Sequence, residues 1–167
     1  MKIIERPVYS KRIKPFIGKG IIKVLTGQRR VGKSYIMMQL MEDIRKEDAE
    51  ANIIYINMEH EEFRMIRNDE DLFAYLKDRI IDKADNYLFV DEIQDIDGFE
   101  HVLRSLQAKE SCDIFCTGSN ARMLSGELST FLSGRYIEFH IQSLSYTEFL
   151  VFHQLPDNTQ SLILYLT

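Results

Sequence analysis

The sequence predicts an α/β fold: a three-layer α/β/α sandwich built on a five-stranded, mostly parallel β-sheet. Short apolar, β-branched runs alternate along the chain with amphipathic stretches of helical periodicity, which is typical of a parallel sheet covered by helices. Two of the runs are apolar on both faces, as strands in the middle of a covered sheet are. With 167 residues, the chain has room for one such domain and is too short for two.

Five runs are expected to form strands, because each is short and ends in a polar or glycine-bearing turn. The runs NYLFVD and DIFCT are the two without a polar face, and we expect them at the centre of the sheet. The expected strands cover residues 21–25, 52–57, 86–91, 113–117 and 135–141.

Helices are expected between the strands, where apolar residues recur at helical spacing. The helix after the first strand has five such residues on one face: Ile36, Met37, Leu40, Met41 and Ile44. The other expected helices cover 71–81, 100–107 and 121–132. Residues 1–20 look like a lead-in that packs beside the sheet, 21–155 form the core, and 156–167 begin a further helix and stop. That ending suggests a fragment of a longer chain.

Composition and charge narrow the class of protein. The chain has 45% hydrophobic residues and a net charge of -5, and this acidic balance disfavours nucleic-acid binding by bulk electrostatics. No apolar run approaches the ~18 residues of a membrane span, and the N-terminus lacks a signal-peptide core. We therefore expect a soluble, cytoplasmic protein without membrane association. Cys112 and Cys116 lie too far apart along one strand for a disulfide, and we expect both to be core or strand residues.

A phosphate-binding loop is indicated directly after the first expected strand. The segment GQRRVGKS matches G-x-x-x-x-G-K-S/T and opens an expected helix, which is the context that its mechanism requires. Glycines let the backbone amides turn towards phosphate oxygens, the lysine reaches the β and γ phosphates, and the serine hydroxyl binds Mg²⁺. The expected phosphate-binding residues are Gly27, Gln28, Arg29, Arg30, Val31, Gly32, Lys33 and Ser34.

An acidic pair ends the strand over 86–91. We expect Asp91 to bind Mg²⁺ through water and Glu92 to polarise the water that attacks the γ-phosphate. Taken alone, the two acids also fit a solvated turn at a strand end. Together with the phosphate loop they favour hydrolysis over binding alone.

A polar side chain at the tip of the next strand is expected between the activated water and the γ-phosphate. Thr117 is the first choice and Asn120 the second. Ser119 and Asn120 fit equally well as caps of the helix that follows. Arg135 is either an arginine finger for a neighbouring copy's nucleotide in a homo-oligomer or a surface arginine, and Arg122 is read as a helix-surface charge.

Other phosphate chemistries fit the sequence less well. The segment DIDG over 95–98 formally matches D-x-x-G, but it lies beyond the end of its strand, and the guanine-reading N-K-x-D is absent. GTP is therefore disfavoured. A P-loop kinase uses the same loop but generally has no use for a water-activating glutamate after the strand aspartate.

The motifs together resemble a known family. GQRRVGKS, FVDEIQDI and the segment from TGSNARM to SYTEF look like the prokaryotic AAA-type P-loop ATPases related to the origin-recognition and signalling branches. The resemblance spans nearly the whole chain, from residue 6 to residue 167. Family members typically continue with a helical lid, a winged-helix-like region and a nuclease-like domain, so 156–167 would be the start of a truncated lid, and a second sensor arginine is lacking.

The resemblance implies ATP as the nucleotide, Mg²⁺ as the metal and the same residues as the site. Of the loop arginines, one is expected to contact phosphate and the other to pair with an acid such as Glu59 or Asp91, and the sequence does not say which does which. We expect an ATPase coupled to a conformational change on a macromolecular partner, with DNA reached only through further C-terminal domains. The alternative is a slow, nucleotide-gated interaction switch.

Overall fold

The computed structural model describes residues 4–118 and 132–166, and its centre is a five-stranded sheet. The strands are β1 (Ile22–Thr26), β2 (Asn52–Asn57), β3 (Asn86–Asp91), β4 (Asp113–Gly118) and β5 (Tyr136–His140). Their order across the sheet is β2-β3-β4-β1-β5, and every pairing is parallel. The expected five-stranded sheet is confirmed, and each strand lies within one residue of its predicted run.

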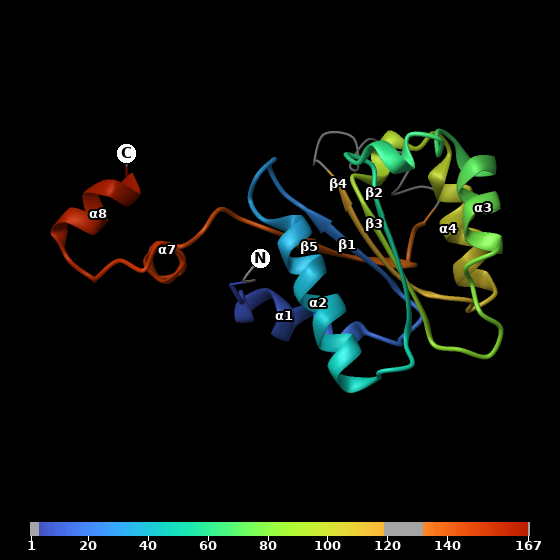
Figure 1. The fold of residues 1–167 in the computed structure, drawn as a ribbon, viewed down its shortest axis with the longest axis horizontal. Coiled ribbons are helices and arrows are strands. Elements are labelled where there is room, and N and C mark those ends of the chain that lie inside the picture. The colour runs from blue at the N-terminus through green and yellow to red at the C-terminus, as the bar shows by residue number, and fades with distance from the viewer. Residues whose placement is uncertain (1–3, 119–131, 167) are drawn as a thin grey trace.

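Helices cover both faces of this sheet (Figure 1). One face packs against α1 (Pro7–Ile13) and α2 (Lys33–Glu47), and the other against α3 (Asp69–Lys77) and α4 (Phe99–Ala108). Within the described residues, short 3₁₀ helices at Lys14–Phe16, Glu61–Phe63 and Ile93–Asp95 join these elements. The predicted three-layer α/β/α sandwich is therefore confirmed.

Alternate residues of the central strands build the two halves of the core. Leu88 and Val90 pack on the α3–α4 side, whereas Phe89 packs on the α1–α2 side. There its ring stacks on that of Phe115, with centroids 4.3 Å apart. Burying one such side chain contributes roughly 2 kcal/mol, so this alternation fixes both the register and the two helical layers.

The helix α2 follows its sequence pattern, and its five periodic apolar residues are buried. The helix α3 is shorter than the predicted stretch 71–81, since it ends at Lys77. The side chain of Asn86 accepts from the amide of Ile81 and donates to its carbonyl, both at 2.9 Å. These bonds hold the last predicted residues in a turn that leads into β3.

The C-terminal part forms two helices, α7 (Tyr146–His153) and α8 (Thr159–Leu166). A capping box between Ser145 and Glu148 starts α7. Figure 1 shows both helices beside each other and away from the sandwich, joined to β5 by an extended segment. Thus α7 packs with α8, and the expected boundary of the core at residue 155 stays a prediction.

The expectation for the two cysteines is met. Cys116 is a buried residue of β4 and Cys112 lies half-buried just before it, and both thiols are free. No helix in residues 4–118 or 132–166 is long and apolar enough to span a membrane.

Candidate functional site

The parallel register brings the carboxyl ends of the strands to one edge. Asn57 pairs with Asp91, and Thr26 pairs with Gly118. The strand β4 lies between β1, which leads into the phosphate loop, and β3, which carries the acidic pair. Open α/β sheets bind ligands at this edge.

The loop over 27–32 has backbone geometry that requires glycine at two positions. Gly27 has φ of 144°, and a Cβ there would stand 2.3 Å from the carbonyl oxygen of Ile141. That carbonyl is close because the amide of Ile141 donates to the carbonyl of Thr26 at 2.7 Å. Gly32, with φ of 93°, is the N-cap of α2. The loop therefore curls tightly and leads into the N-terminus of α2, where free amides favour an anion.

Lys33 folds back over its own loop. Its ammonium donates to the carbonyl oxygens of Gly27 at 3.2 Å and Gln28 at 3.1 Å, and the side chain is only 4% exposed. The same ammonium lies 3.7 Å from Oε1 of Glu92. The lysine of the loop and the second of the two acids, Glu92, therefore lie close together.

Asp91 is buried at the end of β3 and is held from two sides. One carboxylate oxygen accepts from the hydroxyl of Thr117, and the other accepts from that of Tyr55 at 3.4 Å. Burial, reinforced by the charge of Asp91, raises the pKa of Tyr55 to about 12. Tyr55 therefore remains a protonated donor to the carboxylate across the physiological range.

Glu92 occupies a left-handed backbone conformation with φ of 56°. Its amide donates to the hydroxyl of Thr117 at 2.9 Å. One side-chain oxygen, Oε2, accepts from Nε2 of Gln94 at 2.6 Å, and the other faces Lys33. A strained backbone held by surrounding contacts is a feature that clusters at active sites.

Thr117 is fully buried, and its hydroxyl joins the two acidic residues. It therefore lies beside the expected catalytic pair, as the sequence indicated. A contact of this hydroxyl with the γ-phosphate or its water stays a prediction. Asn120, like Ser119 and Arg122, lies outside the described residues.

The two loop arginines differ in their contacts. The guanidinium of Arg29 lies 3.3 Å from the carboxylate of Glu59, and both side chains are exposed. Arg30 has a left-handed φ of 67°. A cavity of about 620 Å³ lies between the loop and the acids, and its lining includes Arg29, Arg30, Lys33, Ser34, Glu59 and Glu92.

Arg135 does not reach this cavity within its own chain. It precedes β5, and its carbonyl accepts from the amide of Ile22 at 3.0 Å, where β1 begins. The phosphate loop follows the other end of β1, ~13 Å away for a five-residue strand. The structure thus leaves the two alternatives for Arg135, a finger for a neighbouring copy or a surface residue.

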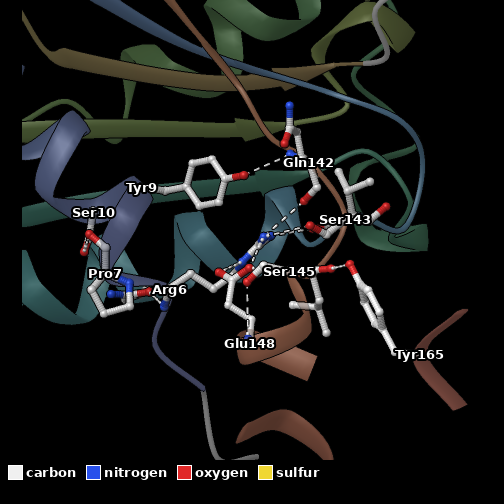
Figure 2. Close-up of polar contacts among 12 residues, drawn as sticks. Arg6, Pro7, Tyr9, Ser10, Gln142, Ser143, Ser145, Glu148 and Tyr165 are labelled. Atoms are coloured by element: carbon white, nitrogen blue, oxygen red, sulfur yellow. Dashed lines mark hydrogen bonds and ion pairs between the residues drawn. The ribbon is translucent and has the colours of Figure 1, made fainter. Parts of the chain in front are cut away.

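Arg6, which the sequence analysis did not single out, fastens the lead-in to the site (Figure 2). Its guanidinium donates to the carbonyl of Val31 and the carboxylate of Glu148, each at 2.8 Å, and to the carbonyl of Gln142 at 3.1 Å. The buried arginine thus joins the phosphate loop to α7. The family resemblance begins at this residue, but no phosphate-binding motif includes it, so the sequence did not mark it as part of the site.

A second and larger cavity, of about 850 Å³, adjoins this contact. It lies against the phosphate loop, and α1, the segment after β5 and α8 also contribute. The residues that line it include Tyr9, Gln28, Val31, His140, Glu148 and Tyr165.

The donor set near the loop suits Mg²⁺ bound together with phosphate. Among the described residues, no three His, Cys, Asp or Glu side chains gather to hold a metal by themselves. Mg²⁺ usually takes one or two carboxylates with phosphate and water oxygens. The carboxylate of Asp91 and the hydroxyl of Ser34 provide oxygen donors of this kind.

Fold and site together define a P-loop nucleotide-binding protein, because the phosphate loop follows β1 and the acids follow β3, with β4 inserted between them. Residues 19–150 match the family described as AAA domain. The chain belongs to this family of AAA-type P-loop ATPases.

Two curated relatives match most of the chain. An uncharacterised protein of Haemophilus influenzae is 37% identical over 150 residues, which are 89% of this chain and 38% of the relative. An uncharacterised protein of Methanocaldococcus jannaschii is 38% identical over 151 residues, or 90% of this chain and 32% of the relative. The chain thus spans well under half the length of both relatives.

Solved structures share the fold at low sequence identity. Hsp104 of S. cerevisiae, in its casein complex, has a TM-score of 0.67 at 15% identity, covering 91% of this chain and 29% of Hsp104. Cdc6p of Pyrobaculum aerophilum has a TM-score of 0.60 at 14% identity, covering 92% and 50%. PCH-2 of C. elegans has a TM-score of 0.55 at 16% identity, covering 83% and 40%.

Proposed function

We propose that this chain binds ATP with Mg²⁺ and hydrolyses the γ-phosphate bond. The observation that carries the proposal is the 3.7 Å approach of the Lys33 ammonium to the Glu92 carboxylate. This spacing supports the proposal because a phosphate-binding cation and a base for water so close together would both reach one shared phosphate.

Each residue has a defined part in this reaction. The loop amides and Lys33 bind the phosphates, and the present bonds of Lys33 to two loop carbonyls are exchanged for phosphate oxygens. Ser34 and Asp91 hold Mg²⁺, which neutralises charge on the phosphates, and Glu92 orients and polarises the attacking water. Arg29 pairs with Glu59, which leaves Arg30 to contact phosphate.

The nucleoside end of ATP is assigned to the 850 Å³ cavity beside the loop. Its rings, from Tyr9, His140 and Tyr165, offer surfaces on which a flat base can stack. Stacking accepts any flat base and does not distinguish adenine from guanine. The preference for adenine is therefore inferred from the family resemblance.

A nucleotide-gated switch is the second candidate, and the Arg6 contact favours it. The guanidinium binds the phosphate loop and α7 at once, so a change in the loop on nucleotide binding would bias the position of α7 and its neighbour α8. A macromolecular partner would read that position, and a neighbouring copy would supply Arg135.

Three variants of the full chain test the proposal. Lys33→Ala should abolish nucleotide binding, whereas Glu92→Gln should keep ATP bound and stop its hydrolysis. Lys46→Ala is the matched control, since Lys46 lies on the same helix with an exposed side chain, 3.8 Å from the carboxylate of Asp43. An unchanged hydrolysis rate for Glu92→Gln would remove Glu92 from the mechanism.

Steady-state rates separate the two candidates. Typical enzymes turn over about ten times per second. Strong stimulation by DNA would favour a motor or remodelling protein. A rate far below the typical value, with tight retention of nucleotide, would favour the switch.

A further inference from the structure

Gln94 has an unusual combination of contacts next to the catalytic pair. Its Nε2 donates to Oε2 of Glu92 at 2.6 Å. Its Oε1 is buried and has no hydrogen-bond partner within the described part of the chain. Buried polar atoms without partners are rare in folded proteins, so this one requires a reason.

The orientation of this amide is fixed by its neighbour. If the amide were turned over, its oxygen would face the carboxylate of Glu92, and two acceptors would repel each other at close range. Only the observed orientation places a donor on the carboxylate. The unsatisfied oxygen of Gln94 is therefore the consequence of its bond to Glu92.

Stability alone does not account for a glutamine at this position. Leaving a buried carbonyl unpaired costs about 1–3 kcal/mol, whereas a hydrogen bond contributes a net 0.5–1.5 kcal/mol, or about twice that when one partner is charged. Gln94 also lies between the buried Ile93 and Ile96 on the short helix after β3, where an apolar side chain would pack without an unsatisfied atom.

We propose that Gln94 is a positioning residue for hydrolysis, which holds the carboxylate of Glu92 so that Oε1 faces the γ-phosphate. This inference rests on the function proposed above. The backbone of Glu92 is already fixed through Thr117, but its side chain has rotatable bonds of its own. Gln94 fixes the end of that side chain, as a third group orients the base in other catalytic sites.

The same geometry explains why one oxygen stays available. Lys33 lies on the Oε1 side of the carboxylate and Gln94 on the Oε2 side. When phosphate takes the ammonium of Lys33, Oε1 is released to accept a proton from water. Oε2 remains bound to the amide of Gln94. This donor is uncharged, so the phosphate attracts it less than it attracts the ammonium of Lys33.

The experiment replaces Gln94 by a side chain of similar length without polar atoms. In the full chain, Gln94→Met should lower kcat for Mg-ATP by about tenfold or more, a part of the 10²–10⁴ that a positioned base contributes. The Kd for ATP should stay within about twofold, and the melting temperature should be equal or higher, because an unsatisfied atom is removed. Gln107→Met is the control: its amide donates to backbone carbonyls of Gly20 and Arg135 instead, and kcat should not change.

A double variant shows whether the effect passes through Glu92. In the Glu92→Gln background, adding Gln94→Met should change the residual kcat, measured at high enzyme concentration, by less than about twofold, since coupled residues are not additive. Equal losses in both backgrounds, a wild-type kcat for Gln94→Met, or a fall in melting temperature that accompanies weaker ATP binding would overturn the assignment. If the wild-type chain does not bind and hydrolyse ATP, the proposed function itself fails. If Glu92→Gln hydrolyses ATP at the wild-type rate, Glu92 is not the base and the role of Gln94 fails with it; if Glu92→Gln is inactive while Gln94→Met is fully active, only the role of Gln94 fails.

Discussion

The hydroxyl of Thr117 donates a hydrogen bond to the carboxylate of Asp91 and accepts one from the amide of Glu92, at 2.9 Å for the latter. Because β4 lies between β1 and β3, this hydroxyl stands between the phosphate loop and the acids. A single buried side chain therefore fixes both the proposed Mg²⁺ ligand and the backbone of the proposed base.

Replacing Thr117 by valine should impair both folding and turnover. Valine keeps the shape but leaves the carboxylate and the amide without this partner, which should lower the free energy of unfolding by about 1–3 kcal/mol. A misplaced base should lower kcat by about tenfold to a hundredfold. Thr117→Ser retains the hydroxyl and should keep most of both quantities. Denaturant unfolding and ATP hydrolysis measure them, and equal behaviour of the two variants would contradict the argument.

Gly27→Ala should disable the loop. The added Cβ would meet the carbonyl of Ile141 at 2.3 Å in a backbone conformation that disfavours side chains, and we expect a loss of about 3 kcal/mol or more with loss of ATP binding. The control is Gly18→Ala, whose φ is 68° but which has open space around it. This variant should lose only about 1–2 kcal/mol of unfolding free energy, because a side chain in the left-handed conformation is strained. If thermal unfolding shows that Gly27→Ala and Gly18→Ala lose similar stability, the predicted clash between the added Cβ and the carbonyl of Ile141 does not persist in the folded protein.

The fold was predictable because its signals are local. Each apolar run predicts a strand and the periodic face of α2 predicts a helix, without reference to the rest of the chain. The alternation of strands and helices then allows few sheet topologies. The end of α3 was not predictable, because the side chain of Asn86 that replaces its last turn belongs to the next strand. Likewise, nothing local showed that α7 would leave the sandwich.

The site divides in the same way. The loop and the acidic pair carry motifs, so Lys33 and Glu92 were named from the sequence and lie 3.7 Å apart. Gln94 lies in the FVDEIQDI segment, but the sequence assigned a role only to the two acids there, and it assigned none to Arg6; the parts of both residues follow from the atoms that they contact. Arg135 is the opposite case. Its sequence position suggested a catalytic role, but it lies beside the start of β1, whereas the phosphate loop of the same chain follows the end of β1.

The two thiols should react slowly with alkylating reagents in the folded protein. Burial raises the pKa of Cys116 to about 12 and that of Cys112 to about 11. At pH 8, about one in ten thousand Cys116 thiols and about one in a thousand Cys112 thiols would be the reactive thiolate. Mass spectrometry after iodoacetamide treatment should find little label in buffer and two labels in denaturant. Rapid native labelling of Cys116 would contradict its burial in β4.

The ion pair between Arg6 and Glu148 should make stability depend on pH. The hydrogen bond from Arg6 holds the pKa of Glu148 below its usual value, so the folded state favours the charged carboxylate. Its contribution is fully present above the ordinary glutamate pKa of about 4.3 and is lost as pH falls through the lowered value. Glu148→Gln should therefore be less stable than wild type at pH 7, with the difference shrinking below about pH 4. Glu61→Gln, which removes an exposed pair with Arg64, should differ little at either pH. A Glu148→Gln deficit in denaturant unfolding that persists at pH 3 would show that the carboxylate charge is not its source.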